Sequence, residues 1–385
     1  MGVRTRGYVA VVFTAAAMVS SFVHAAGPQA ADNLKICFGE KHAAMLKPDG
    51  TVATWGQNDM GQLGTGTNTP STVPVKVVNL ANVTAIACGA SFTLALRNDG
   101  TVMGWGQNLM GQLGNRTKVN TPFPVQTLDI TDVEQIAAGK AHAVALLKSG
   151  MVMGWGSNIY GQVGDGAQKP TLSPVRLFGD LKGIQMISAR GDHTLALAAD
   201  GTVWSWGLNK SGQLGSGIKS DIALPSQVIG LFNVYAAKAG NQHSVAVKED
   251  GTVWAWGLDN NGQTGIGVGG AWGTGITLPA PVFYLKDVTA IFTCGNSTFA
   301  QRKDWTVWAW GNNSAGQLCL GSKTDVPWPL QVNAATGVQS VICSEAQTIL
   351  VKNDGTMFAC GDNSTGLLGD KIKGQSSIPV KLTLE

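Results

Sequence analysis

Apolar and polar residues follow a strand-like pattern that tight turns interrupt, and residues 83–128 show it most clearly. Residues 83–88 alternate, residues 92–96 form a second apolar run, and residues 101–105 form a third. Between the second and third runs, Asn98-Asp99-Gly100 supplies residues that accept a positive φ. This pattern predicts two strands joined by a tight hairpin, preceded by one further strand.

A short fourth strand is predicted over residues 124–128. It begins with proline, which lacks a backbone donor and is therefore tolerated at the outer edge of a sheet but not in its centre. Four short antiparallel strands in about 50 residues are typical of one blade of a β-propeller.

One sequence motif recurs along the chain. It is clearest from Asp99 to Gly114, and it begins again at Asp49, Ser149, Asp200, Asp250, Asp304 and Asp354. Its tryptophan falls at Trp55, Trp105, Trp155, Trp206, Trp256 and Trp310, with Cys360 in the seventh place, in steps of 50, 50, 51, 50, 54 and 50 residues. A fixed period in this range indicates stacked units. We therefore predict an all-β fold, a seven-bladed propeller of four-stranded antiparallel blades.

The predicted third strand suggests how the blades pack. One face carries large groups, such as Trp204 with Trp206, and the other carries small ones, such as Gly104 and Ala255. Large groups against small ones allow stacked sheets to interdigitate at native density. We expect each blade to press its tryptophan face onto the small-residue face of the next blade.

Residues 1–25 form a different kind of sequence. Arg4 and Arg6 precede an apolar stretch, and small residues end it at Ala25. This arrangement predicts a secretory signal peptide cleaved near Ala25, followed by a flexible lead-in over 26–33 and the propeller over 34–385. The alternative is an uncleaved membrane anchor. No second apolar run appears, so we expect no membrane span in the mature chain and a secreted or periplasmic location.

The net charge of the chain does not indicate a strongly charged partner such as a nucleic acid. The chain has 27 Lys and Arg against 24 Asp and Glu, a net charge of +3, without a basic or acidic run. A broad electrostatic patch for nucleic acid is therefore not expected.

The repeat resembles a known family. Residues 136–146 read Ile-Ala-Ala-Gly-Lys-Ala-His-Ala-Val-Ala-Leu, and Asp/Ser-Gly, Trp-Gly-x-Asn and Gly-Gln-Leu-Gly follow in most copies. This series resembles the regulator of chromosome condensation repeat over nearly all of the mature chain. The resemblance implies a seven-bladed propeller. It also implies, as an alternative function, guanine-nucleotide exchange on a small GTPase through a hairpin protruding from one blade. The longest insertion here is only four residues, within 265–275, which is short for that hairpin.

Candidate chemistry is sparse. His42, His142, His193 and His243 share one column of the repeat, which suggests either a metal site or a structural histidine copied with the repeat. The glycine-rich residues 265–270 match a dinucleotide fingerprint by letters but lack its strand–helix context. We expect no metal, no cofactor and no enzymatic activity. An envelope- or polysaccharide-active enzyme is the alternative, and it would need two carboxylates meeting in one cleft.

Six cysteines in an exported chain raise the question of disulfides. Cys319 replaces the last glycine of Gly-Gln-Leu-Gly in repeat six, and Cys360 replaces the tryptophan in repeat seven. We predict a disulfide between them that joins the last two blades. Cys88, Cys294 and Cys343 share a column near the channel, with Cys37 one residue away; they are either bonded or small buried hydrophobic residues.

Two tryptophans outside the regular strand positions are candidate partner-binding residues. Trp272 lies in the glycine-rich insertion of repeat five, and Trp305 replaces the turn glycine of repeat six. Large exposed aromatic residues are enriched at interface hot spots. We therefore predict a monomeric, secreted, non-catalytic scaffold that binds another macromolecule, a protein above all, through Trp272 and Trp305.

Overall fold

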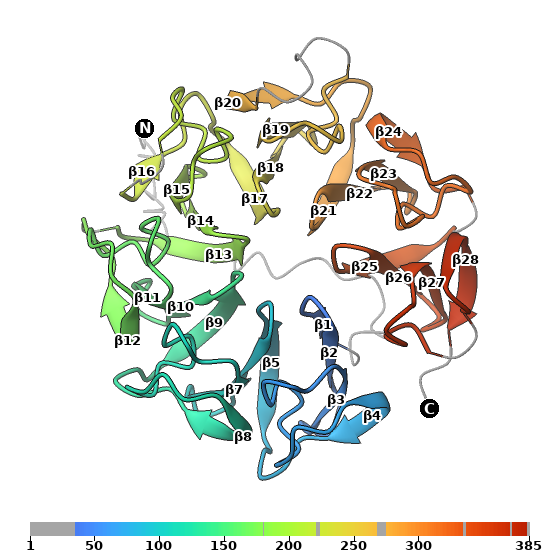
Figure 1. Cartoon of the computed structure of the whole chain (residues 1–385). Coiled ribbons are helices and arrows are strands. Elements are labelled where there is room, and N and C mark those ends of the chain that lie inside the picture. The colour runs from blue at the N-terminus through green and yellow to red at the C-terminus, as the bar shows by residue number, and fades with distance from the viewer. Residues whose placement is uncertain are drawn as a thin grey trace, which may run out of the picture.

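The computed structural model describes residues 35–179, 181–220, 224–267, 275–333, 336–369 and 372–382. Within these ranges, 28 strands form seven four-stranded antiparallel sheets around a central axis (Figure 1). Each sheet uses four strands that are consecutive in sequence, so the predicted all-β, seven-bladed propeller is confirmed. The same ranges contain no helix long and apolar enough to cross a membrane. The predicted signal peptide and lead-in lie outside the described residues.

The strands of each blade run from the centre of the ring outward. The innermost strands are β1 (Lys35–Phe38), β5 (Val83–Cys88), β9 (Val133–Ala138), β13 (Ile184–Arg190), β17 (Val234–Ala239), β21 (Val288–Cys294) and β25 (Val338–Cys343). The second strands are β2 (His42–Leu46), β6 (Phe92–Arg97), β10 (His142–Leu147), β14 (His193–Ala198), β18 (His243–Lys248), β22 (Ser297–Arg302) and β26 (Gln347–Lys352).

The two outer positions complete each sheet. The third strands are β3 (Val52–Gly56), β7 (Val102–Gly106), β11 (Val152–Gly156), β15 (Val203–Gly207), β19 (Val253–Gly257), β23 (Val307–Gly311) and β27 (Met357–Asp362). The outermost strands are β4 (Ser71–Lys76), β8 (Thr121–Gln126), β12 (Thr171–Arg176), β16 (Ser226–Gln227), β20 (Ile276–Pro281), β24 (Val326–Gln331) and β28 (Gln375–Leu382).

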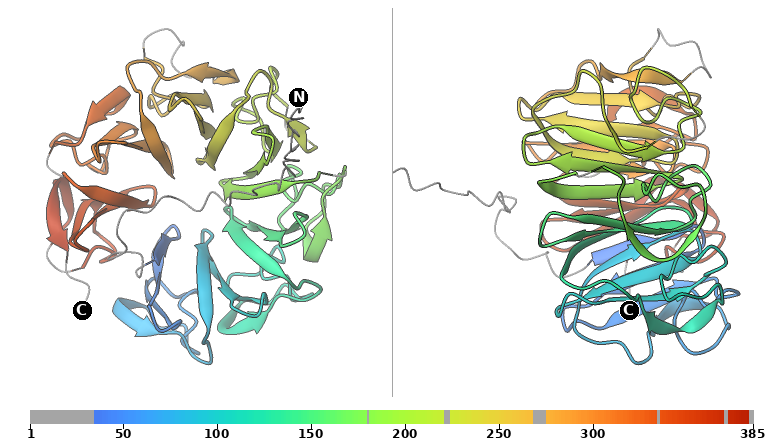
Figure 2. Two further views of the ribbon diagram at one scale, coloured as in Figure 1. Left: turned by 180° about the vertical axis from the view of Figure 1, so that it is seen from behind. Right: turned by 90° about the vertical axis from the view of Figure 1, so that its left-hand side faces the viewer.

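Antiparallel order gives the disk two different faces, which the side view in Figure 2 separates. One face carries the turns between first and second strands and the long loops between third and fourth strands; we call it the loop face. The other carries the tight hairpins between second and third strands and the connectors from one blade to the next; we call it the hairpin face.

The predicted outer strand of repeat two is correct in place but wrong in both bounds, since β8 ends at Gln126 rather than at residue 128. β8 begins at Thr121 rather than at residue 124, and the register between β7 and β8 shifts between Gly104 and Gly106. Pro122 and Pro124 fall within this irregular part of the edge strand, where no regular ladder needs their missing donors.

In six of the seven blades, a buried tryptophan joins the blade to the one before it. Trp105 of the second blade packs in one cluster with Ala44, Leu46 and Val52 of the first blade. The tryptophan face therefore meets the preceding blade, and the predicted direction of packing, toward the next blade, is wrong. The sequence could not settle this direction, because either order pairs a large face with a small one.

The indole N–H of each of these tryptophans donates to a main-chain carbonyl of the preceding blade. The bonds are Trp105 to Gln62 at 2.9 Å, Trp155 to Gln112 at 2.9 Å, Trp206 to Gln162 at 3.0 Å, Trp256 to Gln213 at 2.8 Å, Trp310 to Gln263 at 3.1 Å, and Trp55 to Leu367 at 3.0 Å. The last bond joins the first blade to the seventh and so closes the ring. Each indole is almost completely buried, and its one polar group is satisfied.

The final glycine of Gly-Gln-Leu-Gly is needed to admit this tryptophan. Gly64 has a φ of 66°, and a Cβ built on it would lie 2.9 Å from the ring of Trp105. Any other residue at Gly64 would therefore have to displace the indole while adopting an unfavourable backbone conformation.

The contact between blades six and seven uses a different chemistry. Cys319 stands where the other repeats have this glycine, Cys360 stands where they have the tryptophan, and the two form a disulfide with a Cα–Cα distance of 5.7 Å. A covalent bond thus occupies the place of the glycine–tryptophan contact. Two further disulfides join neighbouring inner strands, Cys37 to Cys88 and Cys294 to Cys343, with Cα–Cα distances of 5.6 and 5.2 Å.

The four repeated histidines are buried and also act between blades. Each Nε2 lies 2.9 to 3.0 Å from a hydroxyl of the next blade, on Thr93, Thr194, Ser244 or Thr298. These hydroxyls donate to main-chain carbonyls, as Ser244 does to Gln213 at 2.8 Å, so the Nε2–H is the donor. Each Nδ1 is buried without a partner in the described structure, and burial lowers the pKa of His42 to about 4 and of the other three to about 3.

We predict that Cys360→Ala lowers the free energy of unfolding by about 2–4 kcal/mol, because it removes the cross-link and leaves the seam between the last two blades with neither a disulfide nor a tryptophan. The double variant Cys319→Gly, Cys360→Trp restores the residues of the other seams and should recover much of that loss. Urea unfolding of both variants measures the effect. A Cys360→Ala protein as stable as the parent would show that this seam does not depend on the disulfide.

A second prediction concerns pH. Because burial lowers the folded-state pKa of the four histidines below the usual 6.5, the unfolded chain takes up protons first as the pH falls. Their contribution to stability is complete above about pH 6.5 and is lost as the pH falls toward 4, by up to about 1.4 kcal/mol per pH unit for each histidine. Urea unfolding between pH 7.5 and 4.5 measures this slope.

The chain itself supplies the control. The second blade has Phe92 where four other blades have histidine, and the third blade has Ala143 at the matching hydroxyl position. The variant His142→Phe, Thr194→Ala copies this natural pair and should reduce the slope between pH 6.5 and 5. An unchanged slope would assign the acid sensitivity to other groups.

Candidate functional site

Trp305 lies in the tight turn between β22 and β23, on the hairpin face. Its side chain is 38% exposed and its φ is 63°. The other six repeats have glycine at this position, at residues 50, 100, 150, 201, 251 and 355, all with positive φ. A bulky residue held in the left-handed region costs about 1–3 kcal/mol. The turn therefore tolerates Trp305 rather than requiring it.

Tyr284 breaks the pattern in the same way in the connector between β20 and β21. Its φ is 62° and its side chain is 98% exposed. The four preceding connectors have Asn79, Asp129, Gly179 and Gly230 at this left-handed position, which are the residue types that accept it readily. Tyr284 is not among the residues predicted from the sequence, although aligning the connectors with one another reveals it.

Phe283, next to Tyr284, is a third exposed aromatic residue. It is 54% exposed, and its ring centroid lies 6.4 Å from that of Tyr284. Earlier connectors also expose an apolar residue at this position, at Leu128, Phe178 and Ile229, but none of them has a second aromatic residue beside it. We call Phe283, Tyr284 and Trp305 the aromatic surface.

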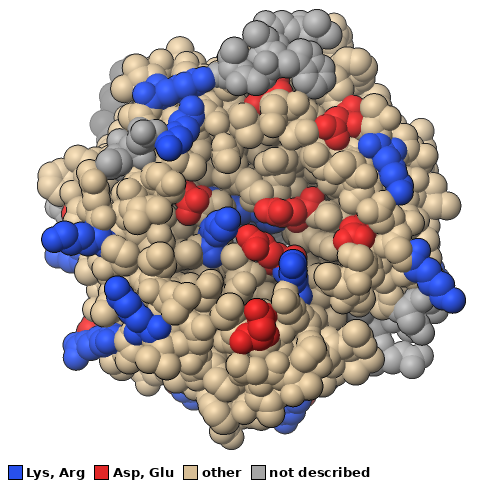
Figure 3. Space-filling view, viewed as in Figure 1, with Lys and Arg blue, Asp and Glu red and all other residues tan. Residues whose placement is uncertain are grey.

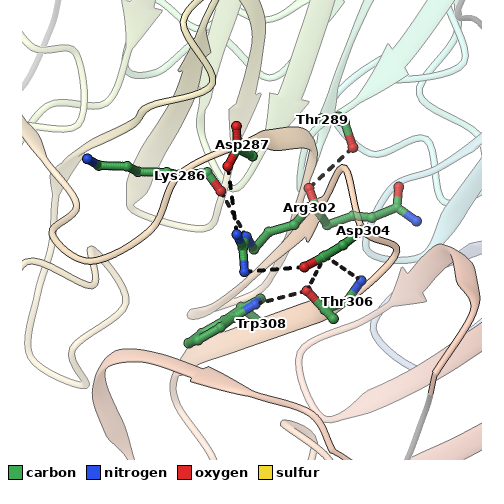
Figure 4. A network of polar contacts seen from close by, with 8 residues as sticks. Lys286, Asp287, Thr289, Arg302, Asp304, Thr306 and Trp308 are labelled. Carbon is green, nitrogen blue, oxygen red and sulfur yellow. Dashed lines mark hydrogen bonds and ion pairs between the residues drawn. The ribbon is translucent and has the colours of Figure 1, made fainter.

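A polar network fixes the connector against the hairpin that holds Trp305 (Figure 4). Arg302 donates through Nε to the carbonyl of Lys286 at 3.0 Å, and its Nη atoms lie 3.8 Å from Asp287 and 3.4 Å from Asp304. The N–H of Lys303 donates to the carbonyl of Asp287 at 2.8 Å. The two segments that carry the aromatic surface are therefore held together by one arginine and one main-chain bond.

The same network orders the turn itself. One oxygen of Asp304 accepts from the hydroxyl of Thr306 at 2.6 Å and from its N–H at 3.1 Å. These bonds, the hydroxyl first, hold the pKa of Asp304 below its usual range, and Arg302 adds to the effect. Trp308 donates to the Thr306 hydroxyl at 3.2 Å and lies beneath the Arg302 guanidinium at 6.0 Å. These hydrogen bonds hold the turn that carries Trp305 in one conformation, which favours a role for Trp305 in an interface.

Trp272, the other predicted partner-binding residue, lies outside the described residues. The strands on either side of its segment, β19 and β20, end and begin on the loop face, whereas Trp305 is on the hairpin face. The surface described here therefore rests on Trp305 together with Phe283 and Tyr284.

Other polar clusters are weaker candidates for a functional site. The described ranges hold no group of three or more His, Cys, Asp or Glu that could bind a metal ion. Asp129 and Asp132 line one depression on the hairpin face. However, Asp129 is engaged by Arg116 through two bonds, at 2.6 and 3.1 Å, which leaves it poorly placed for general acid or base catalysis.

Comparison with known proteins agrees with the repeat. Residues 17–273 match the model of the RCC1-like domain, and residues 306–351 match that of the regulator of chromosome condensation (RCC1) repeat. The structure superposes on yeast RCC1 (Prp20), solved bound to Kap60, with a TM-score of 0.77 at 21% identity, covering 91% of this chain and 84% of that one.

Two relatives are similar in sequence over about half of the chain. HERC6 of Homo sapiens is 31% identical over 195 residues, which are 48% of this chain and 19% of HERC6. The ultraviolet-B receptor UVR8 of Arabidopsis thaliana is 30% identical over 215 residues, which are 54% of this chain and 49% of UVR8. The chain thus matches less than half the length of either relative. With the family model covering residues 17–273 and the seven-bladed fold in place, the chain belongs to the RCC1-like domain family.

Proposed function

We propose that this protein is a secreted, non-catalytic scaffold that binds a partner protein through the aromatic surface. The observation that carries the proposal is the pair of exposed aromatic residues, Tyr284 and Trp305, at left-handed positions where the other repeats have glycine, asparagine or aspartate. Local rules broken on an exposed, rigid surface are typical of functional sites. Phe283 enlarges the apolar area that a partner would cover.

The cysteines support export. All six form disulfides, and each disulfide joins two different blades. Such bonds form and persist in oxidising compartments. Together with the signal-like residues 1–25, they favour a secreted or periplasmic protein.

The relatives support a protein as the partner. Yeast RCC1 was solved bound to Kap60, and a second structure of it, from Saccharomyces cerevisiae, concerns its binding to Gsp1p and histones. At 21 and 22% sequence identity, these similarities show only a shared fold. The partners of yeast RCC1 therefore do not identify the partner of this chain.

The exchange-factor alternative has less support from the structure. That function was expected to need a hairpin protruding from one blade. In the described residues every hairpin is short, as between Leu46 and Val52 in the first blade and between Arg302 and Val307 in the sixth. The tight turn bonds repeat, for example Gly50 N–H to Lys47 O at 3.0 Å and Trp305 N–H to Arg302 O at 2.9 Å.

We predict that Trp305→Gly and Tyr284→Asn each weaken partner binding by at least about 2 kcal/mol, since each removes an exposed aromatic anchor. Both variants restore the residue type of the other repeats, so the melting temperature should stay the same or rise as backbone strain is relieved. Capture from the extracellular fraction by immobilised residues 26–385, with quantitative mass spectrometry, identifies the partner, and titration of that partner measures its affinity.

Phe178→Val is the matched control, because Phe178 is also an exposed aromatic residue, in another connector of the hairpin face. It should retain the partner that Trp305→Gly loses. A partner that binds all three variants equally would place the binding surface elsewhere, and a fall in melting temperature for Trp305→Gly would make that residue structural.

Export has its own test. Expression of the full chain in its source should give a secreted or periplasmic protein whose amino-terminal sequence begins at Ala26, because Ala25 ends the cleavage motif. The variant Ala25→Arg should block cleavage and leave the protein attached to the membrane. A chain found in the membrane fraction with residues 1–25 intact would instead support the anchor alternative.

A further inference from the structure

The turns that follow the third strands carry apolar residues in three neighbouring blades. The two central positions of this turn hold Leu109 and Met110 in blade two and Ile159 and Tyr160 in blade three, and Met60 takes the second position in blade one. In the other four blades the two positions hold Lys210 and Ser211, Asn260 and Asn261, Ser314 and Ala315, and Ser364 and Thr365. The large apolar residues therefore gather on one side of the loop face.

Several of these side chains are exposed although they are apolar. Leu109 is 53% exposed, Ile159 is 49% exposed and Met110 is 39% exposed. Val119, in the long loop of blade two, is 69% exposed. Single exposed apolar residues are common on protein surfaces, whereas a group of them on neighbouring loops indicates an interaction site.

Contacts between the blades place these turns side by side. Asn120 Nδ2 lies 3.3 Å from the Sδ of Met60, and the N–H of Asn108 donates to Asn120 Oδ1 at 2.8 Å, which links the turns of blades one and two. A Cβ built on Gly111 would lie 2.6 Å from Leu172 Cδ2, so the turn of blade two also touches β12 of blade three. We call the following residues the apolar arc: Met60, Leu109, Met110, Val119, Ile159 and Tyr160.

Hydrogen bonds fix the backbone beneath the apolar arc. In blade two, the N–H of Gly111 donates to the carbonyl of Asn108 at 2.9 Å, and the N–H of Met110 donates to Gln112 Oε1 at 2.9 Å. The same two bonds recur in blade three, at 3.1 and 2.9 Å. The apolar side chains are therefore presented on ordered turns, and binding need not order the backbone first.

Lysines stand beside the apolar arc in the same blades. Lys118 and Lys169 are exposed in the long loops of blades two and three, and in the part of the chain that the structure describes neither forms a hydrogen bond or an ion pair. The Nζ of Lys210 lies 5.8 Å from the centroid of the Tyr160 ring, which brings a third cation to the end of the arc.

The acidic side chains of these loops are engaged within the protein. Asp165 accepts from Asn158 Nδ2 at 2.8 Å and from the N–H of Ala167 at 2.9 Å. Asp59 accepts from Gln62 Nε2 at 3.2 Å. The lysines are therefore the charged groups beside the arc that are free to meet a ligand, and they favour a negatively charged one.

The loop face as a whole has a similar arrangement of charge. Figure 3 looks onto this face: Lys and Arg side chains mark much of its rim, and acidic side chains lie mostly nearer the central opening. Two of the acidic residues on the inner turns have partners, since Glu40 lies 3.9 Å from Lys140 and Glu345 accepts from Asn241 at 2.7 Å.

We infer that the loop face binds the surface of an anionic lipid bilayer. The apolar arc enters the headgroup layer, and Lys118 and Lys169 lie against the lipid phosphates. Apolar residues with flanking lysines are the combination that holds proteins at such a surface, and the ring of Tyr160 suits the interface. Binding strengthens with the apolar area buried and with each lysine near the charged headgroups.

The arrangement of the arc favours a bilayer over a protein as the occupant. Protein interfaces concentrate their binding energy in anchors that fill well-packed pockets. The arc instead spreads aliphatic side chains over separate turns of three blades, with lysines between them, and a fluid headgroup layer adapts to such a surface. The aromatic surface lies on the opposite face and would remain free, so this inference does not rest on the proposed partner binding.

Vesicle sedimentation tests the inference with purified residues 26–385, which contain every described strand. Vesicles of phosphatidylglycerol and phosphatidylcholine in equal parts are compared with vesicles of phosphatidylcholine alone. The protein should bind the anionic vesicles at least tenfold more tightly. Raising sodium chloride from about 0.1 to about 0.5 M should weaken this binding, because salt screens the lysines from the headgroups.

Variants that copy other blades identify the surface. The double variant Leu109→Ser, Ile159→Asn introduces the residues of blades six and five and should weaken binding to anionic vesicles at least tenfold, with an unchanged melting temperature. Lys118→Gln and Lys169→Gln should each weaken it about fivefold, the contribution of one lysine near a charged membrane surface. Ile229→Ser is the matched control, because Ile229 is a similarly exposed aliphatic residue on the hairpin face, and it should bind as the parent does.

A second measurement locates the contact without a variant. Lipid nanodiscs of the anionic composition, with a nitroxide-labelled lipid, should broaden the methyl resonances of Leu109, Met110 and Ile159 and leave that of Ile229 unchanged.

The inference is overturned if anionic vesicles are not bound, if neutral vesicles are bound equally, or if Leu109→Ser, Ile159→Asn binds as the parent does. Loss of vesicle binding in Trp305→Gly would also overturn it, by placing the membrane contact on the hairpin face. A protein that the parent captures and the double variant loses, without any vesicle binding, would make the arc a protein-binding surface instead.

Discussion

The structure depends on one contact, the burial of a tryptophan from each of six blades against the preceding blade with its indole N–H bonded to a main-chain carbonyl there. Burying an indole removes roughly 200 Å² from water, which at about 25 cal/mol per Å² is several kcal/mol before entropy is counted. Because all four strands of every blade are consecutive in sequence, no strand is shared between the first and last blades. The ring is therefore closed by side-chain packing, with Trp55 bonded to Leu367 across the closure.

Much of the fold could be predicted from the sequence because the repeat encodes it seven times. The Asp-Gly turns, the alternation of strand residues and the tryptophan steps specify the strands and the number of blades. The direction of packing could not be predicted, since it depends on which face of the blade the Gly-Gln-Leu-Gly loop covers. The site was predicted in part: Trp305 stands out in its own repeat, whereas Tyr284 is visible only when the connectors between blades are aligned with one another.

Departures from the repeat have two different physical consequences in this chain. Cys319 and Cys360 change together, and their disulfide takes over a structural contact. Phe92 and Ala143 likewise replace a histidine and a hydroxyl together, so no buried polar group is left without a partner. Tyr284 and Trp305 change alone, and no neighbour compensates for them. Uncompensated departures leave strain or exposed aromatic area, which are the features that binding can relieve.

The central claim is that the hairpin face around Tyr284 and Trp305 contacts the partner. Site-specific photo-crosslinking tests it directly, with benzoylphenylalanine placed at 284, at 305 and, as a matched position on the same face, at 178. The account predicts crosslinks to the captured protein from 284 and 305 and none from 178. Crosslinks from 178 alone, or from residues of the loop face with none from 284 and 305, would contradict it.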